Sequence, residues 1–177
     1  MVRKRVLFFL NNPELAAEYK INTPNGMLLY GPPGTGKTTL AKALAKSISA
    51  DSYLLTNSFV GLKRDIDLLS TSYSCIILFG IDKDLIHTVR IESIAKKETE
   101  IVSALNLRTI SSQLNDVGVV NSISNKPTSY LCNEAYWHLL RKFHGNAVLI
   151  HIPSSKNASE TLMEKLRMVF TTYLTDK

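Results

Sequence analysis

Residues 31–38 carry the feature that most restricts what this chain can fold into. They read Gly31-Pro32-Pro33-Gly34-Thr35-Gly36-Lys37-Thr38 and fit the pattern G-x-x-x-x-G-K-[ST] at every fixed position. A short apolar run, residues 27–30, precedes them, and residues 37–46 have the apolar spacing of a helix. The pattern predicts a strand, a phosphate-binding turn and a helix, the order of a nucleotide-binding βα unit.

Each residue type in this segment has a physical reason to bind phosphate. Glycines let backbone N–H groups converge on phosphate oxygens, and a helix that begins near Lys37 adds free N–H groups and its positive dipole end. The Lys37 ammonium would bridge the β- and γ-phosphates, and the Thr38 hydroxyl would bind Mg²⁺. We therefore expect the nucleotide to be held by Gly31, Pro32, Pro33, Gly34, Thr35, Gly36, Lys37, Thr38 and Thr39.

Residues 26–45 resemble the AAA family of ATPases almost residue for residue, and the approach through residues 13–15 and 21–24 is similar to the same family. The resemblance extends more weakly to about residue 165. It implies ATP and Mg²⁺ as cofactors and a homo- or hetero-oligomer, of which a ring is one form. It also implies a protein client that is threaded or remodelled, while nucleic acid stays open as a second kind of partner.

Two polar residues in the C-terminal third match functional positions of that family. Residues 119–127 resemble the AAA strand that ends in a polar sensor, which implies that Asn125 holds the attacking water. Residues 139–143 resemble the segment of the arginine finger, which implies that Arg141 acts on nucleotide bound by a neighbouring subunit. The alternatives are a turn-forming asparagine before Lys-Pro and a solvated arginine at a helix end.

The acidic motif is where the chain departs from the family. AAA enzymes follow the third strand with Asp-Glu, whereas residues 76–85 of this chain contain no Glu. Asp82 is the acid nearest to the strand end, so the resemblance implies Asp82 as the second Mg²⁺ ligand beside Thr38, with Asp84 as the substitute. Lys83 is cationic and cannot act as a base at neutral pH. A missing base would lower the rate by ~10²–10⁴.

Three functions remain open at this point. The leading hypothesis is an ATPase that remodels a protein client, with Lys37, Asp82, Asn125 and Arg141 as its catalytic residues. The second is an ATP-binding regulatory or structural module with little or no hydrolysis, because the catalytic Glu is missing. The third is a small P-loop kinase, which the matches at Asn125 and Arg141 and the absence of an Arg-rich lid disfavour.

Strands alternate with helices over most of the chain, which predicts an α/β fold: a three-layer P-loop NTPase with a mostly parallel central sheet. Apolar runs predict strands at 27–30, 53–55, 75–79, 117–120 and 147–152. Helical spacing predicts helices at 37–46, 63–69, 98–114, 134–143 and after a cap at Ser159. The expected domains are an N-terminal extension over 1–12, an AAA-type core over 13–158 and a C-terminal helix over 159–177, the start or remnant of a lid.

Composition narrows the remaining possibilities. The 177 residues carry a net charge of +6 without a long basic run, so charge alone does not choose a partner. No apolar run reaches ~18 residues, so we expect no transmembrane helix and a soluble, intracellular protein. Two cysteines are too few for a disulfide framework, and Cys75 and Cys132 are expected to be reduced core thiols.

Two further interpretations concern isolated side chains. Phe59-Val60-Gly61 resembles the AAA pore loop that grips a peptide, and an ordinary loop is the alternative. The four histidines show no spacing typical of metal ligands or of a Ser/His/Asp set, so we expect structural or surface roles for His87, His138, His144 and His151.

Overall fold

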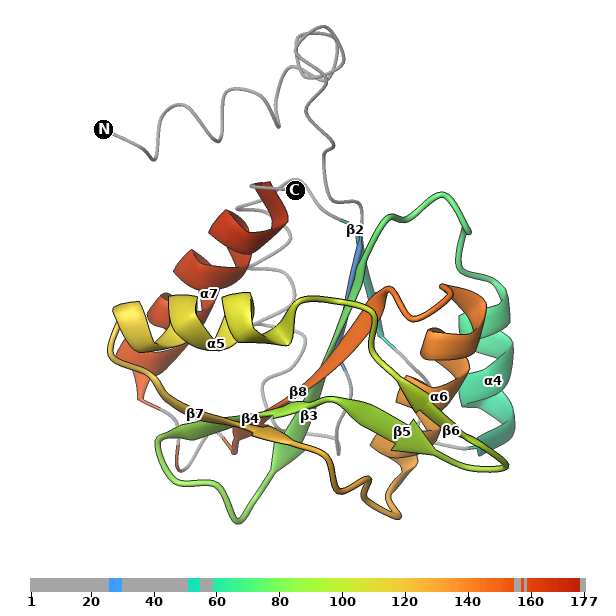
Figure 1. Cartoon of the computed structure of the whole chain (residues 1–177), viewed down its shortest axis with the longest axis horizontal. Coiled ribbons are helices and arrows are strands. Elements are labelled where there is room, and N and C mark those ends of the chain that lie inside the picture. The colour runs from blue at the N-terminus through green and yellow to red at the C-terminus, as the bar shows by residue number, and fades with distance from the viewer. Residues whose placement is uncertain (1–25, 30–50, 55–58, 155–156, 158, 176–177) are drawn as a thin grey trace, which may run out of the picture.

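The computed structural model describes residues 26–29, 51–54, 59–154, 157 and 159–175 (Figure 1). The expected N-terminal extension and the predicted phosphate-binding residues 31–39 lie outside the described residues. Within the described part, strands form a central sheet and helices pack on both of its faces (Figure 1). None of the described helices is long and apolar enough to cross a membrane.

The central sheet has six strands in the spatial order β2-β1-β3-β8-β4-β7. Four of them, β2 (Asp51–Leu54), β1 (Gly26–Leu29), β3 (Ile76–Asp82) and β8 (Ala147–Pro153), are parallel neighbours. The next strand, β4 (Thr88–Glu92), pairs antiparallel with β8, and β7 (Val120–Ser124) pairs parallel with β4. The last two strands therefore run opposite to the other four, and the sheet is mixed.

Helices cover the two faces in pairs. On one face α4 (Phe59–Asp67) packs against α6 (Leu131–Lys142), and on the other α5 (Leu107–Asp116) packs against α7 (Glu160–Thr175) (Figure 1). A short antiparallel pair, β5 (Ile94–Lys96) and β6 (Glu100–Val102), lies against α6. We name the two sides the α6 face and the α7 face.

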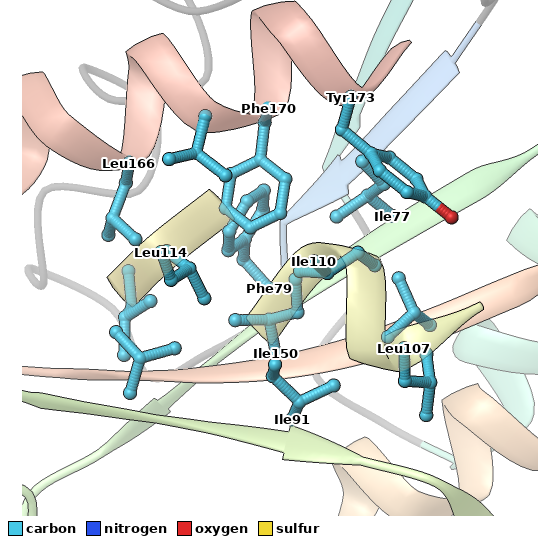
Figure 2. Close-up of a cluster of buried hydrophobic side chains, with 14 of the residues drawn as sticks. Ile77, Phe79, Ile91, Leu107, Ile110, Leu114, Ile150, Leu166, Phe170 and Tyr173 are labelled. Carbon is cyan, nitrogen blue, oxygen red and sulfur yellow. The ribbon is translucent and has the colours of Figure 1, made fainter. Parts of the chain in front are cut away.

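The α7 face holds a largely apolar core. Figure 2 shows Ile77, Phe79 and Ile150 of the sheet packed against side chains of α5 and α7. The rings of Phe79 and Phe170 meet edge to face, with centroids 5.1 Å apart. Because side chains alternate along a strand, Ile76 and Leu78 point to the α6 face and pack in a second cluster. This explains why β3 and β8 read as continuous apolar runs: both of their faces are buried.

The predicted P-loop NTPase architecture is wrong for the second half of the sheet. A short connection, residues 83–87, follows β3, and it is too short for the crossover helix that a parallel neighbour requires. The Asp82 side chain accepts a hydrogen bond from the Asp84 N–H at 2.9 Å, and His87 has a positive φ of 54°. These features form a tight reversal that sends β4 back across the sheet, antiparallel to β8.

Three local predictions also need correction. The predicted helix over 98–114 is a strand, β6, followed by α5, because the Asn106 side chain accepts from the Thr109 N–H and starts the helix there. The strand expected at 117–120 begins only at Val120. The predicted pore loop at 59–61 is the first turn of α4. The cap at Ser159 is confirmed, since its Oγ accepts from the Leu162 N–H at 3.1 Å.

Candidate functional site

Asp82 is the last residue of β3. It lies at the same end of the sheet as the carboxyl end of β1. The two strands are parallel, with Leu29 beside Phe79, so the carboxyl ends of β1 and β3 lie at the same end of the sheet. Both carboxylate oxygens of Asp82 have protein partners. Arg90 Nη2 donates to Oδ2 at 2.8 Å, and the Asp84 N–H donates to Oδ1. Asp82 supplies the oxygen ligand that Mg²⁺ prefers, but binding the ion would require exchange of one of these partners.

Asn125 and Asp82 lie at opposite ends of the strands of the central sheet. Asn125 follows β7, whose last residue Ser124 pairs with Glu92, and β4 and β7 run against β3. Its side chain is exposed. Arg141 is also exposed and stacks its guanidinium over the Trp137 ring, 4.6 Å from the centroid. The structure therefore does not bring Asp82 and Asn125 together.

No metal centre is formed by the side chains that the structure describes. Among them, no group of three or more His, Cys, Asp or Glu residues is arranged to hold an ion. The other predicted metal ligand, Thr38, lies outside the described ranges, as does Lys37. Of the two predicted metal ligands, Asp82 is the one that lies within the described residues.

A different cluster of chemically active side chains occupies the α6 face. Cys132 is the second residue of α6, and its Sγ lies 4.0 Å from Nε2 of His151 on β8. The same Nε2 lies 3.5 Å from Oε1 of Glu92 on β4. The side chains of His151 and Glu92 are only 3% and 2% exposed. A thiol, an imidazole and a carboxylate therefore meet in a buried site; we call these three residues the thiol cluster.

Strand register explains why these residues meet. His151 pairs with Gly80 on one side and with Arg90 on the other, and Glu92 pairs with Leu149. Paired residues on neighbouring strands point to the same face, so His151 and Glu92 both face α6. Gly80 leaves room for the imidazole, because an added Cβ would lie 3.1 Å from His151 Nδ1.

Arg90 joins the thiol cluster to Asp82. Its Nε donates to Glu92 Oε1 at 2.8 Å while its Nη2 donates to Asp82. Two buried polar atoms of the cluster, Glu92 Oε2 and His151 Nδ1, have no hydrogen-bond partner among the residues that the structure describes. Unsatisfied buried atoms are costly, and where they occur together they indicate a site that accepts a ligand or a proton.

Burial keeps both reacting groups of the cluster uncharged. Burial, followed by the positive charge of Arg90, lowers the pKa of His151 to about 4 against the opposing effect of Asp82. Burial likewise raises the pKa of the Cys132 thiol above its ordinary value. At neutral pH the pair is therefore a thiol beside a neutral imidazole, and the lowered pKa makes this imidazole a weak base.

A cavity of about 300 Å³ opens at the amino end of α6. Thr128 and Asn133 are among its lining residues, and the Thr128 Oγ1 lies 3.8 Å from the Cys132 Sγ. The cavity therefore reaches to within one side chain of the thiol.

Sequence reasoning placed Cys132 among the core thiols and His151 among the structural histidines. The structure confirms that both cysteines are free and buried, and it places His151 against Cys132, a contact that the sequence did not reveal. The missing signal was β4: without that strand, nothing placed Glu92 beside His151. A cysteine just inside a helix and a histidine within a strongly apolar strand were the available hints.

The sequence matches proteins of one ATPase family. A sequence profile described as the AAA ATPase domain matches residues 14–174. Proteasome-activating nucleotidase 2 of Haloferax volcanii is 38% identical over 109 residues, which cover 56% of this chain and 26% of that protein. The proteasome-activating nucleotidase of Methanococcus vannielii is 39% identical over 105 residues, covering 54% and 26%. The chain therefore spans about a quarter of the length of the curated relatives it matches.

The described fold is similar to solved structures with a different name. Pyrrolidone carboxyl peptidase from Thermococcus litoralis superposes with a TM-score of 0.65 at 18% identity, covering 85% of this chain and 93% of that one. The enzyme of that name from Thermus thermophilus gives 0.68 at 12% identity, covering 82% and 98%. Likeness at these identities shows the fold alone. It agrees with the mixed sheet and overturns the predicted P-loop NTPase architecture.

Proposed function

The chain belongs to the AAA ATPase domain family, and from this premise we propose that it binds Mg·ATP and couples hydrolysis to remodelling of a protein client in an oligomer. The support is the phosphate-binding motif at residues 31–38 together with the family match. The names of the relatives, proteasome-activating nucleotidases, support a nucleotide-driven action on proteins.

The residues proposed for this activity are those of the motif and of the end of the sheet where β1 and β3 finish. Residues 31–39 bind the nucleotide, with Lys37 on the phosphates and Thr38 on Mg²⁺. Asp82 exchanges its hydrogen-bond partner Arg90 for Mg²⁺ and so becomes a metal ligand. This is possible because β3 and β1 end at the same end of the sheet. The exposed guanidinium of Arg141 stands open to a neighbouring subunit. Asn125 has no role at the nucleotide of its own subunit in this proposal, since it lies at the other end of the sheet.

An ATPase assay on the full chain tests this proposal. We expect Lys37→Ala to abolish ATP binding, and Asp82→Asn to reduce Mg²⁺-dependent phosphate release while Asp84→Asn, two residues away, does not. ATP binding by the wild type without phosphate release above the Lys37→Ala background would contradict hydrolysis and leave a nucleotide-binding module. A strict monomer with and without ATP would contradict the role of Arg141.

The thiol cluster carries a second proposed function, a thiol-dependent acyl hydrolase. The observation that favours it is the meeting of Cys132, His151 and Glu92 in a buried site beside a cavity. The likeness to carboxyl peptidases supports only the fold, so this proposal rests on the three side chains. Nucleophile, base and carboxylate are the residue types of acyl-transfer enzymes, but here Sγ of Cys132 and Oε1 of Glu92 both face Nε2 of His151.

The chemistry of the proposed hydrolase is balanced by proton transfers through His151 in both half-reactions, the last of which returns the proton taken from water to the departing Cys132 thiolate. Cys132 Sγ attacks the carbonyl carbon of an ester or amide while its proton passes to His151 Nε2. The tetrahedral adduct collapses to a thioester, and the leaving group departs with the proton from His151. Water then attacks the thioester, again with His151 as base, and releases the acid and the free thiol. Glu92 stabilises the imidazolium that forms in each step.

Alkylation with iodoacetamide tests this second proposal, with the other buried cysteine as an internal control. We expect Cys132 to react faster than Cys75 in the folded protein, and Cys132→Ser to remove this fast reaction while Cys75→Ser preserves it. Equal, slow labelling of the two thiols in the native protein would overturn the proposal, because burial alone would then describe both.

A further inference from the structure

Arg90 holds two carboxylates on the α6 face at once. Its Nε and Nη2 donate to Glu92 and Asp82 over distances of 2.8 Å each, and its own side chain is 27% exposed. The two acids end up on either side of the guanidinium because Asp82 is two residues beyond Gly80, and Arg90 stands across β8 from that strand. A planar guanidinium suits such a bridge, since it directs several N–H groups outward in a fixed plane.

We propose that Arg90 is a positioning residue of the thiol cluster, which fixes the Glu92 carboxylate toward His151 Nε2 through a bridge anchored on Asp82. The inference rests on the second proposed function. Glu92 Oε1 is the oxygen that faces His151, and it is also the oxygen that accepts from Arg90. Without Arg90 the buried carboxylate would lose its one side-chain donor and with it a fixed orientation.

Arg90 also sets the charge on His151. The charged and titratable groups around this imidazole are Arg90 and Glu92 from β4, Asp82 from β3 and Cys132 from α6. Arg90 is the cation among them, and it opposes protonation of the ring. Removing it leaves the acidic groups to stabilise imidazolium, so the pKa of His151 rises. Below the pKa of the Cys132–His151 pair, both groups are protonated and the base is lost.

The test is the pH profile of Cys132 alkylation by iodoacetamide in the full chain, with Cys75→Ser as the common background. In Arg90→Gln we expect the acidic limb of the profile to move up by about one pH unit or more, with a rate about tenfold lower at neutral pH. Arg90→Lys keeps the charge, so the acidic limb should return to its wild-type position. Lysine lacks the planar guanidinium that donates to both carboxylates, so the rate of Cys132 alkylation should stay low.

The variant Asp82→Asn tests the contact between Asp82 and Arg90 separately from the positive charge of Arg90. It retains Arg90 but weakens the far end of the bridge, so we expect a lower rate without an upward shift of the acidic limb. If Arg90→Gln fails to fold, as judged by circular dichroism, Arg90→Lys and Asp82→Asn carry the test. Wild-type rates in both would overturn the inference.

The outcomes distinguish a failure of this inference from a failure of the proposed hydrolase function on which it rests. If His151→Ala leaves the reactivity of Cys132 unchanged, the hydrolase proposal itself fails. If His151→Ala slows Cys132 while Arg90→Gln keeps the wild-type rate and profile, the thiol cluster stands and the role of Arg90 is overturned.

Discussion

The two faces of the central sheet are built from the same strands and differ in what they bury. On the α7 face, alternate residues of β3, β4 and β8 contribute Phe79, Ile91 and Ile150 to an apolar core (Figure 2). On the α6 face, the intervening positions include Gly80, Glu92 and His151 beside apolar neighbours. Both faces bury apolar clusters, and the α6 face in addition brings a thiol, an imidazole and a carboxylate together. The comparison shows that both faces contribute to the core, while the buried thiol, imidazole and carboxylate lie together on the α6 face.

The largest expected effect is on the chemistry of the α6 face. We expect His151→Ala to slow alkylation of Cys132 by ~10²–10⁴, because the thiol, whose pKa burial raises, loses its base. Rate constants for iodoacetamide labelling, resolved by mass spectrometry of the two cysteine peptides, measure this. His138→Ala on the same helix as Cys132 is the control and should leave the rate unchanged. Similar slowing in both variants would show that a general disturbance around α6, and not the loss of the imidazole beside Cys132, lowers the alkylation rate.

The matching change on the α7 face should cost stability and leave the chemistry intact. Phe170 is fully buried against Phe79, so Phe170→Ala should lower the free energy of unfolding by about 3–5 kcal/mol. Urea denaturation measures the loss, and Met168→Ala, an exposed position on the same helix, should change little. Cys132 labelling below the unfolding transition should keep its wild-type rate. A selective loss of that rate would show that the faces are coupled.

Acid should destabilise the protein through the α6 face. His151 takes up a proton near pH 6.5 in the unfolded chain but only near pH 4 in the folded protein. The contribution of His151 to the free energy of unfolding is complete above pH 6.5. As the pH falls through this window, that free energy decreases by on the order of 3 kcal/mol. Unfolding free energies across that range should therefore fall less steeply in His151→Asn than in the wild type. His87→Asn, at an exposed position with positive φ, should follow the wild type.

The smallest expected effect tests how closely the α6 face fits His151. In Gly80→Ala the new Cβ would lie 3.1 Å from Nδ1 and 3.2 Å from Cε1 of His151, so the ring must shift by a few tenths of an ångström. We expect Cys132 labelling to slow by about tenfold. The neighbouring variant Ile81→Val, whose side chain packs toward the α7 face, should not affect labelling. An unchanged rate in Gly80→Ala would show that the ring tolerates the displacement.

Several elements could be predicted because their sequence patterns are local. The continuous apolar runs of β3 and β8 indicated buried strands, and helical spacing indicated α6 and the helix after Ser159. Strand β4 gave no such signal, because Thr88–Glu92 mixes charged and apolar residues with one face in the core and the other in the thiol cluster. The predicted P-loop NTPase architecture failed with it, since the direction of β4 depends on the reversal at residues 83–87.

The sequence by itself determined the phosphate-binding motif and the family, because eight consecutive residues carry the pattern and backbone continuity alone keeps them together. Only the tertiary structure decided that Cys132, His151 and Glu92 meet, since they come from a helix and two strands that are distant in the chain. Strand pairing fixes which residues lie opposite one another, and no local pattern encodes that register here. The same pairing placed Arg90 between Asp82 and Glu92, a contact that no local pattern of the sequence indicated.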